Sequence, residues 1–178
     1  MFIIPIITMK TFAEEKRQKT DQALLTAPTS LTEIVLGKFL GAFILYLICS
    51  CIYLVYAVII SFFTTPEWSV ILCTFLGVVL LGASLIAINV FISVLTESMI
   101  IAAVFGMAVG LLISMMSYFA SMISISWISN ALKAISFMEY YQNFTYGILS
   151  IVDVVFFLSV TTLFLFFTVR ALEKRRWS

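Results

Sequence analysis

The sequence predicts an all-α integral membrane protein, a helix bundle with four full membrane spans. Apolar residues make up 63% of the chain and charged residues 11%, whereas soluble domains contain roughly 45–50% and about 25%. The apolar residues stand in long uninterrupted runs rather than alternating with polar ones. The basic residues collect before the first of these runs and after the last. Residues 1–178 are therefore expected to form a single transmembrane domain.

Four apolar runs indicate the spans, since a helix needs about 20 mostly apolar residues to cross a bilayer. They cover about 39–63, 69–95, 98–122 and 154–169. A short turn around Pro66 joins the first two, which should form an antiparallel hairpin. Thr96 and Glu97 alone separate the second span from the third.

The positions of the basic residues predict how the chain is oriented, because Lys and Arg near span ends are retained on the cytoplasmic side. Nine of the 10 Lys and Arg residues lie before the first span or after the last, and Lys133 is the exception. Four crossings return both ends to one side. The sequence thus predicts a multi-pass protein of the cell membrane with both ends in the cytoplasm.

The first nine residues, Met1 to Met9, are apolar but short. As a helix they would cover about 14 Å at about 1.5 Å per residue, roughly half of the ~30 Å hydrocarbon core. They are expected to form either an interfacial stub or the end of a partial span whose earlier part, with any preceding spans, is missing from this chain.

The segment 10–38 is the largest predicted cytoplasmic piece. Acidic and basic residues are interleaved in it, and Glu15 precedes Lys19 by four residues, a spacing that supports a helix. Pro28 interrupts this helix. Ser30 and Glu33 then form the S-x-x-E pattern of a capping box. A second helix should therefore begin at Leu31 and continue into the first span.

The stretch 123–152 is too polar to cross the membrane and too apolar for an ordinary external loop. Aromatic residues such as Trp127, Tyr140 and Tyr141 are spread through it, and its apolar residues recur at helical spacing. Aromatic rings with one polar edge favour the headgroup layer. Short helices that lie at the outer interface, or re-enter the bilayer where protein covers them, fit this pattern.

Residue types that carry catalysis or hold metals are scarce. The chain has no histidine, the commonest general base and transition-metal ligand. The three cysteines lie inside apolar runs without a C-x-x-C spacing, and we interpret them as apolar fillers. No G-x-x-x-x-G-K-[ST] loop is present. We expect no catalytic site, no metal site and no bound cofactor, and the near-zero net charge gives no argument for nucleic acid.

Polar side chains in the second span and directly after it are candidate functional residues. Asn89 lies deep in this span, where a polar group normally faces the bundle interior. It could make a hydrogen bond between helices worth about 1 kcal/mol, or line a pathway through the bundle. The full candidate group comprises Asn89, Ser93, Thr96 and Glu97.

Gly106 and Gly110 form a G-x-x-x-G pattern in the third span. Glycines at this spacing let two helix backbones approach closely in lipid. They could serve packing within one subunit or between two subunits.

Four blocks of sequence resemble the permeases of the ABC-2 superfamily, especially those related to the gliding-motility and nitrous-oxide-reductase accessory transporters. The most specific block is PIITMKTFAEEKRQKTDQALLTAPTSLTEIVLGKFLGA, from Pro5 to Ala42. The others are GASLIAINVFISVLTES, FMEYYQNFTYGILSIVDVVFFLS and LEKRRW. The chain departs from the family pattern at Asn89, where a glycine is expected, and at Ser98 and Met99, where Asn-Gln is common.

The resemblance implies six spans, re-entrant helices before the last span, and a coupling helix that docks on an ATPase encoded as a separate chain. Met1 to Met9 would then be the end of the second span, so the N-terminal spans would be missing. The ATPase would hold ATP and Mg, and a second permease copy or a paralogue would complete a dimer in the bilayer. The docking residues implied are Glu14, Glu15, Lys16, Arg17, Thr20, Leu24 and Leu25.

The resulting expectation is an exporter permease that works by alternating access on an unidentified amphipathic or apolar substrate. One alternative is a non-transporting scaffold that anchors a cytoplasmic partner through the segment 10–38. Substrate-stimulated ATP hydrolysis would distinguish the two. An ion-coupled carrier is disfavoured because such carriers normally need ionisable residues within the spans, and the four runs hold essentially none.

Overall fold

A computed structural model describes residues 3–13, 30–63, 65–122 and 126–176, and over these residues the chain is helical without strands. This confirms the predicted all-α class. The helices are α1 (Ile3–Thr8), α4 (Leu31–Ser61), α5 (Trp68–Leu95), α6 (Met99–Met122), α7 (Ser126–Ile135), α8 (Phe137–Thr145) and α9 (Ile151–Arg176).

Four of these helices, α4, α5, α6 and α9, are long and apolar enough to span a membrane. They match the four predicted spans, but α4 and α9 extend further into the polar flanks. The capping box explains the early start of α4: Glu33 N donates to Ser30 Oγ, and Ser30 N donates to Glu33 Oε2, each at 3.3 Å. At the end of α9, Arg170 and Glu173 form an ion pair of 2.7 Å one helical turn apart. As predicted, the helix that begins at Leu31 continues without a break into the first span.

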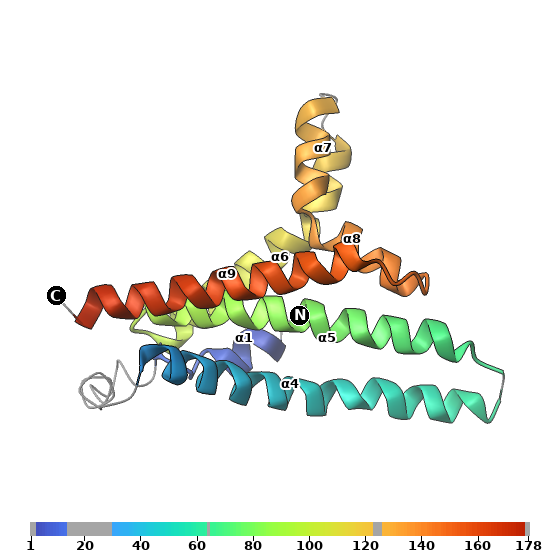
Figure 1. The fold of residues 1–178 in the computed structure, drawn as a ribbon, viewed down its shortest axis with the longest axis horizontal. Helices are drawn as coiled ribbons and strands as arrows, with labels where there is room; N and C mark the ends of the chain where they lie inside the picture. Colours follow the sequence, from blue (N-terminus) through green and yellow to red (C-terminus); the bar gives the residue numbers. More distant parts are fainter. Residues whose placement is uncertain (1–2, 14–29, 64, 123–125, 177–178) are drawn as a thin grey trace.

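Helix α5 is the centre of the bundle. It packs against α4 on one side and α9 on the other, and also contacts α1, α6 and α8 (Figure 1). Its residues from Gly82 to Val90 are all buried, whereas α4 exposes most of its apolar side chains, as at Ile52, which is 70% exposed. Lipid can cover such a surface. The start of α4 and the end of α9 lie at the same end of the bundle (Figure 1), which agrees with four crossings.

Within 123–152, where short helices are predicted, the structure has α7 and α8. Helix α7 pairs with the last part of α6, where Ser129 Oγ donates to Ala120 O at 2.7 Å and the hydroxyls of Ser117 and Ser136 are hydrogen-bonded. This pair projects away from the long helices α4, α5 and α9 (Figure 1). Nothing in the spacing of apolar residues along α6 indicates this projection.

Helix α8 ends in a turn that directs the chain into α9. Gly147 has a φ of 75°, a left-handed conformation that glycine adopts without strain. Gly147 N donates to Phe144 O at 3.1 Å and Ile148 N donates to Asn143 O at 2.9 Å, the two bonds of a Schellman motif. The motif closes α8 and brings its aromatic residues against α9.

An aromatic cluster joins α8 to α9, formed by Phe137, Tyr140, Phe144, Phe156 and Phe157. Beside it, Asn143 Nδ2 donates to Asp153 Oδ2 at 2.9 Å.

Asp153 is 3% exposed and lies in the first turn of α9, where the helix dipole favours a carboxylate. Burial raises the pKa of the Tyr141 hydroxyl on α8, and the proximity of Tyr53 raises it further.

Candidate functional site

The chain that follows α1 is attached to the bundle just before the segment 14–29. Helix α1 packs against α4, α5 and α6, and Thr11 N donates to Thr8 O at 3.1 Å as the chain turns out of the helix. Phe12 and Ala13, the next two residues, are 4% and 0% exposed. Their backbone N–H groups are shielded from water and need partners in the protein.

Ser93 of α5 supplies both partners. Its hydroxyl oxygen accepts the N–H of Phe12 and the N–H of Ala13, each at 3.1 Å. A hydroxyl oxygen has two lone pairs and can accept both bonds. Ser93 is itself 1% exposed, so removing its hydroxyl would leave two buried donors unsatisfied, at about 1–3 kcal/mol each.

Lys38 of α4 holds the same stretch from the other side. Its Nζ donates to Thr11 O and lies 4.1 Å from the ring centroid of Phe12, a cation–π contact. We refer to Thr11, Phe12, Ala13, Lys38 and Ser93 together as the junction. The junction connects α4 and α5 through a short piece of backbone.

The described residues on either side of the segment 14–29 are Ala13, which is bonded to Ser93, and Ser30, the capped start of α4. The predicted docking residues all lie within this segment, outside the described residues: Glu14, Glu15, Lys16, Arg17, Thr20, Leu24 and Leu25. The structure describes the two residues that flank the segment, Ala13 and Ser30. At these points Ala13 N donates to Ser93 Oγ and Ser30 N donates to Glu33 Oε2.

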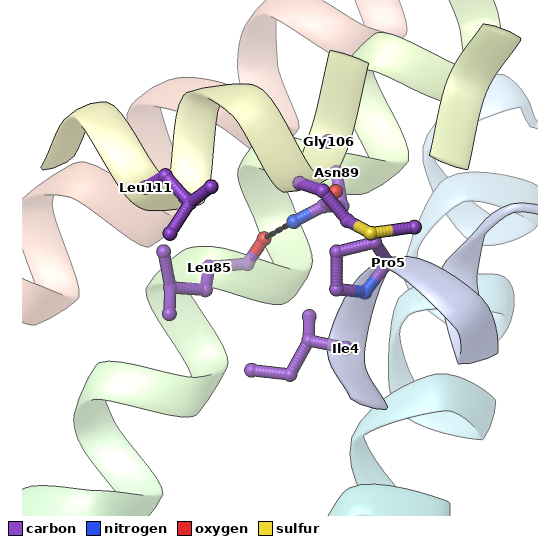
Figure 2. Close-up of a pocket in the computed structure, with 8 residues that line it drawn as sticks. Ile4, Pro5, Leu85, Asn89, Gly106 and Leu111 are labelled. Carbon is purple, nitrogen blue, oxygen red and sulfur yellow. Dashed lines mark hydrogen bonds between the residues drawn. The ribbon is translucent and has the colours of Figure 1, made fainter. Parts of the chain in front are cut away.

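Asn89 lies one helical turn from Ser93 on α5 and is 5% exposed. Its Nδ2 donates to Leu85 O at 2.8 Å (Figure 2). This bond lies within α5, and a hydrogen bond from Asn89 to another helix stays a prediction.

Asn89 also lines a small cavity of about 10 Å³, close to the volume that one water molecule requires. The cavity lies between α1, α5 and α6 (Figure 2), and its lining includes Pro5, Leu85, Asn89, Gly106, Met107 and Gly110. It is far too small to hold an amphipathic substrate.

The two glycines of α6 differ in their surroundings. A Cβ built on Gly106 would overlap Oδ1 of Asn89 and would lie 3.3 Å from Cβ of Pro5, while one on Gly110 would meet nothing within 4 Å. The close approach of α6 to α5 and α1 therefore occurs at Gly106.

The remaining two candidates lie at the end of α5. Thr96 Oγ1 donates to Ile92 O, four residues earlier in the chain, at 3.2 Å. Glu97 is exposed between α5 and α6. Of the four polar candidates, the structure therefore brings Asn89 and Ser93 to the contact with residues 3–13.

Sequence reasoning missed Thr11, Phe12, Ala13 and Lys38 as members of a site. The hydrogen bonds to Ser93 join residues about 80 positions apart, and no local sequence pattern predicts such a pairing. Lys38 counted as one more positive charge near a span end. Its position one residue after Gly37 gave no indication that its side chain reaches back to Thr11.

The bundle and its four apolar helices define a multi-pass membrane protein. Residues 1–171 match the model of a family described as ABC-2 family transporter protein, so the chain belongs to that family. Searches among curated proteins and among solved structures found no match. Proteins of this family are membrane subunits of transporters that are not themselves catalytic and normally work with an ABC ATPase.

Proposed function

We propose that this chain is the permease subunit of an ATP-driven exporter that moves an amphipathic or apolar substrate out of the cytoplasm. The family match over residues 1–171 carries this proposal. The low charge of the four long helices supports the substrate class, because a charged solute would find few partners within them. ATP would be hydrolysed on a separate ATPase chain, and a second permease copy or a paralogue would complete the transport unit.

In this proposal the segment 14–29 docks on the ATPase. Closure of two ATPases on ATP would displace the segment in each permease, and the displacement would shift the helices between inward-open and outward-open arrangements. The placement of both flanks of the segment supports the proposal, because Ala13 and Ser30 are bound to α5 and to the start of α4. A docked segment needs such attachments to move helices rather than to flex by itself.

Reversing the charges of Lys16 and Arg17 to glutamate should weaken ATPase binding by about tenfold or more. Placing like charges against each other across an interface costs several kcal/mol, and about 1.4 kcal/mol corresponds to tenfold. Co-purification of the ATPase with the detergent-solubilised permease measures the effect. Lys133→Glu is the matched control, because it reverses a charge on α7, far along the chain from the segment. Retention of the ATPase by the double variant at the level of the control would count against docking through 14–29.

The proposed orientation, with both ends in the cytoplasm, makes a separate prediction. In a variant whose three cysteines are replaced by serine, Lys133→Cys should react with a membrane-impermeant maleimide in intact cells. Lys16→Cys should react after the cells are permeabilised, because its side of the membrane is closed to the reagent beforehand. Equal labelling of the two positions in intact cells would contradict the orientation.

A further inference from the structure

We propose that Ser93 is a positioning residue that transmits movement of the segment 14–29 into α5. This inference rests on the proposed function, since it assigns the point at which a docked segment acts on the bundle. The two hydrogen bonds from Phe12 N and Ala13 N to Ser93 Oγ carry it. They attach the last described backbone before the segment to a helix that is distant in sequence.

The geometry of Ser93 suits transmission of movement. Its Oγ is two covalent bonds from the helix backbone and is buried, so it cannot follow a displaced segment by changing its own position. Two donors on adjacent residues fix the backbone in orientation as well as distance. Lys38 also attaches this stretch of backbone, but its long flexible stem can adjust to a displacement without moving α4.

Helix α5 is the element best placed to pass the movement on, because it contacts α1, α4, α6, α8 and α9. Ser93 and Asn89 are four residues apart and therefore share one face of α5. At Asn89 this face meets Gly106 of α6 and Pro5 of α1. Residues 3–13 thus contact one face of α5 at two levels, and a pull on Ser93 would act directly on the contact between α5 and α6.

Reactivity of a cysteine at Met107 can report on that contact. Met107 lines the cavity next to Asn89, and Met107→Cys would be introduced after the three native cysteines are replaced by serine. The permease and its ATPase are reconstituted in lipid nanodiscs, and the rate of reaction with N-ethylmaleimide is measured without nucleotide and after trapping with ATP and vanadate. With Ser93 present, trapping should change the rate by about fivefold or more, the lower end of common coupling strengths.

Ser93→Ala should abolish this nucleotide response while the ATPase stays bound and hydrolyses ATP. Ser84→Ala is the matched control: Ser84 is buried in the same helix, and its hydroxyl donates to Leu81 O of that helix at 2.8 Å. The control should keep the full response. Hydrogen exchange at the amides of Phe12 and Ala13 should become faster in Ser93→Ala and stay unchanged in Ser84→Ala.

Ser93→Thr and Ser93→Val provide a second comparison if the alanine variant does not fold. These variants have the same shape, and only threonine retains the hydroxyl. Threonine should keep the nucleotide response and valine should lose it. Equal responses in this pair, or a full response in Ser93→Ala, would overturn the inference. Absence of ATPase binding and of any nucleotide response in the protein with Ser93 would instead overturn the proposed function.

Discussion

Replacing Phe157 with alanine should lower the free energy of unfolding by about 3 kcal/mol. The side chain is 0% exposed, and its ring packs against Phe137, Phe144 and Phe156 at centroid distances of 5.8, 6.3 and 5.5 Å. Truncating a buried phenylalanine costs about 3–5 kcal/mol in soluble proteins. The lower end of this range applies here, because in lipid the hydrophobic effect contributes little to the stability of a helix bundle. The loss of packing contacts then accounts for the lower free energy of unfolding.

Phe166→Ala is the matched control for this substitution. Phe166 lies on the same helix and is 53% exposed, so much of its surface is available to lipid and truncation should cost less than about 1 kcal/mol. Steric trapping in bicelles measures both free energies. Similar losses in the two variants would show that the aromatic cluster does not hold α8 against α9.

The sequence was sufficient for the features that depend on neighbouring residues. Span lengths follow from unbroken apolar runs. The start of α4 follows from Ser30 and Glu33, which are three positions apart and form the two hydrogen bonds of a capping box. The short helices in 123–152 followed from helical spacing of aromatic residues. The predicted ends of the last span were less accurate. Helix α9 continues to Arg176, beyond the predicted end at 169, because charged residues such as Arg170 and Glu173 extend a helix as readily as apolar ones.

Features that depend on distant residues could not be predicted. Ser93 was predicted as a polar candidate of the second span, but its partners are backbone groups about 80 residues away. For Asn89 the sequence left open a hydrogen bond between helices or a place on a pathway, and it did not indicate the bond from its Nδ2 to Leu85 O in the same helix. The projection of α7 depends on hydrogen bonds between α6 and the helices that follow it.

Gly106 and Gly110 show the same limit most sharply. Their spacing makes them equivalent in sequence, yet only a Cβ at Gly106 would overlap Asn89 Oδ1. Gly106→Ala should therefore destabilise the protein by about 1–3 kcal/mol, the usual cost of overpacking a well-packed contact. Gly110→Ala should be neutral or stabilising by up to about 1 kcal/mol, because alanine has the higher helix propensity.

A loss of stability in Gly106→Ala without a loss in Gly110→Ala would make the comparison decisive, and steric trapping measures both free energies of unfolding. Adding Asn89→Ala to Gly106→Ala should recover much of the loss, because it removes the oxygen that the new methyl group meets. Asn89→Ala alone should cost little, since its amide bonds to Leu85 O, a carbonyl of its own helix. Failure of the double variant to recover stability would mean that Pro5, 3.3 Å from the built Cβ, limits the space at Gly106. The approach of α6 would then be set by α1 rather than by the amide of α5.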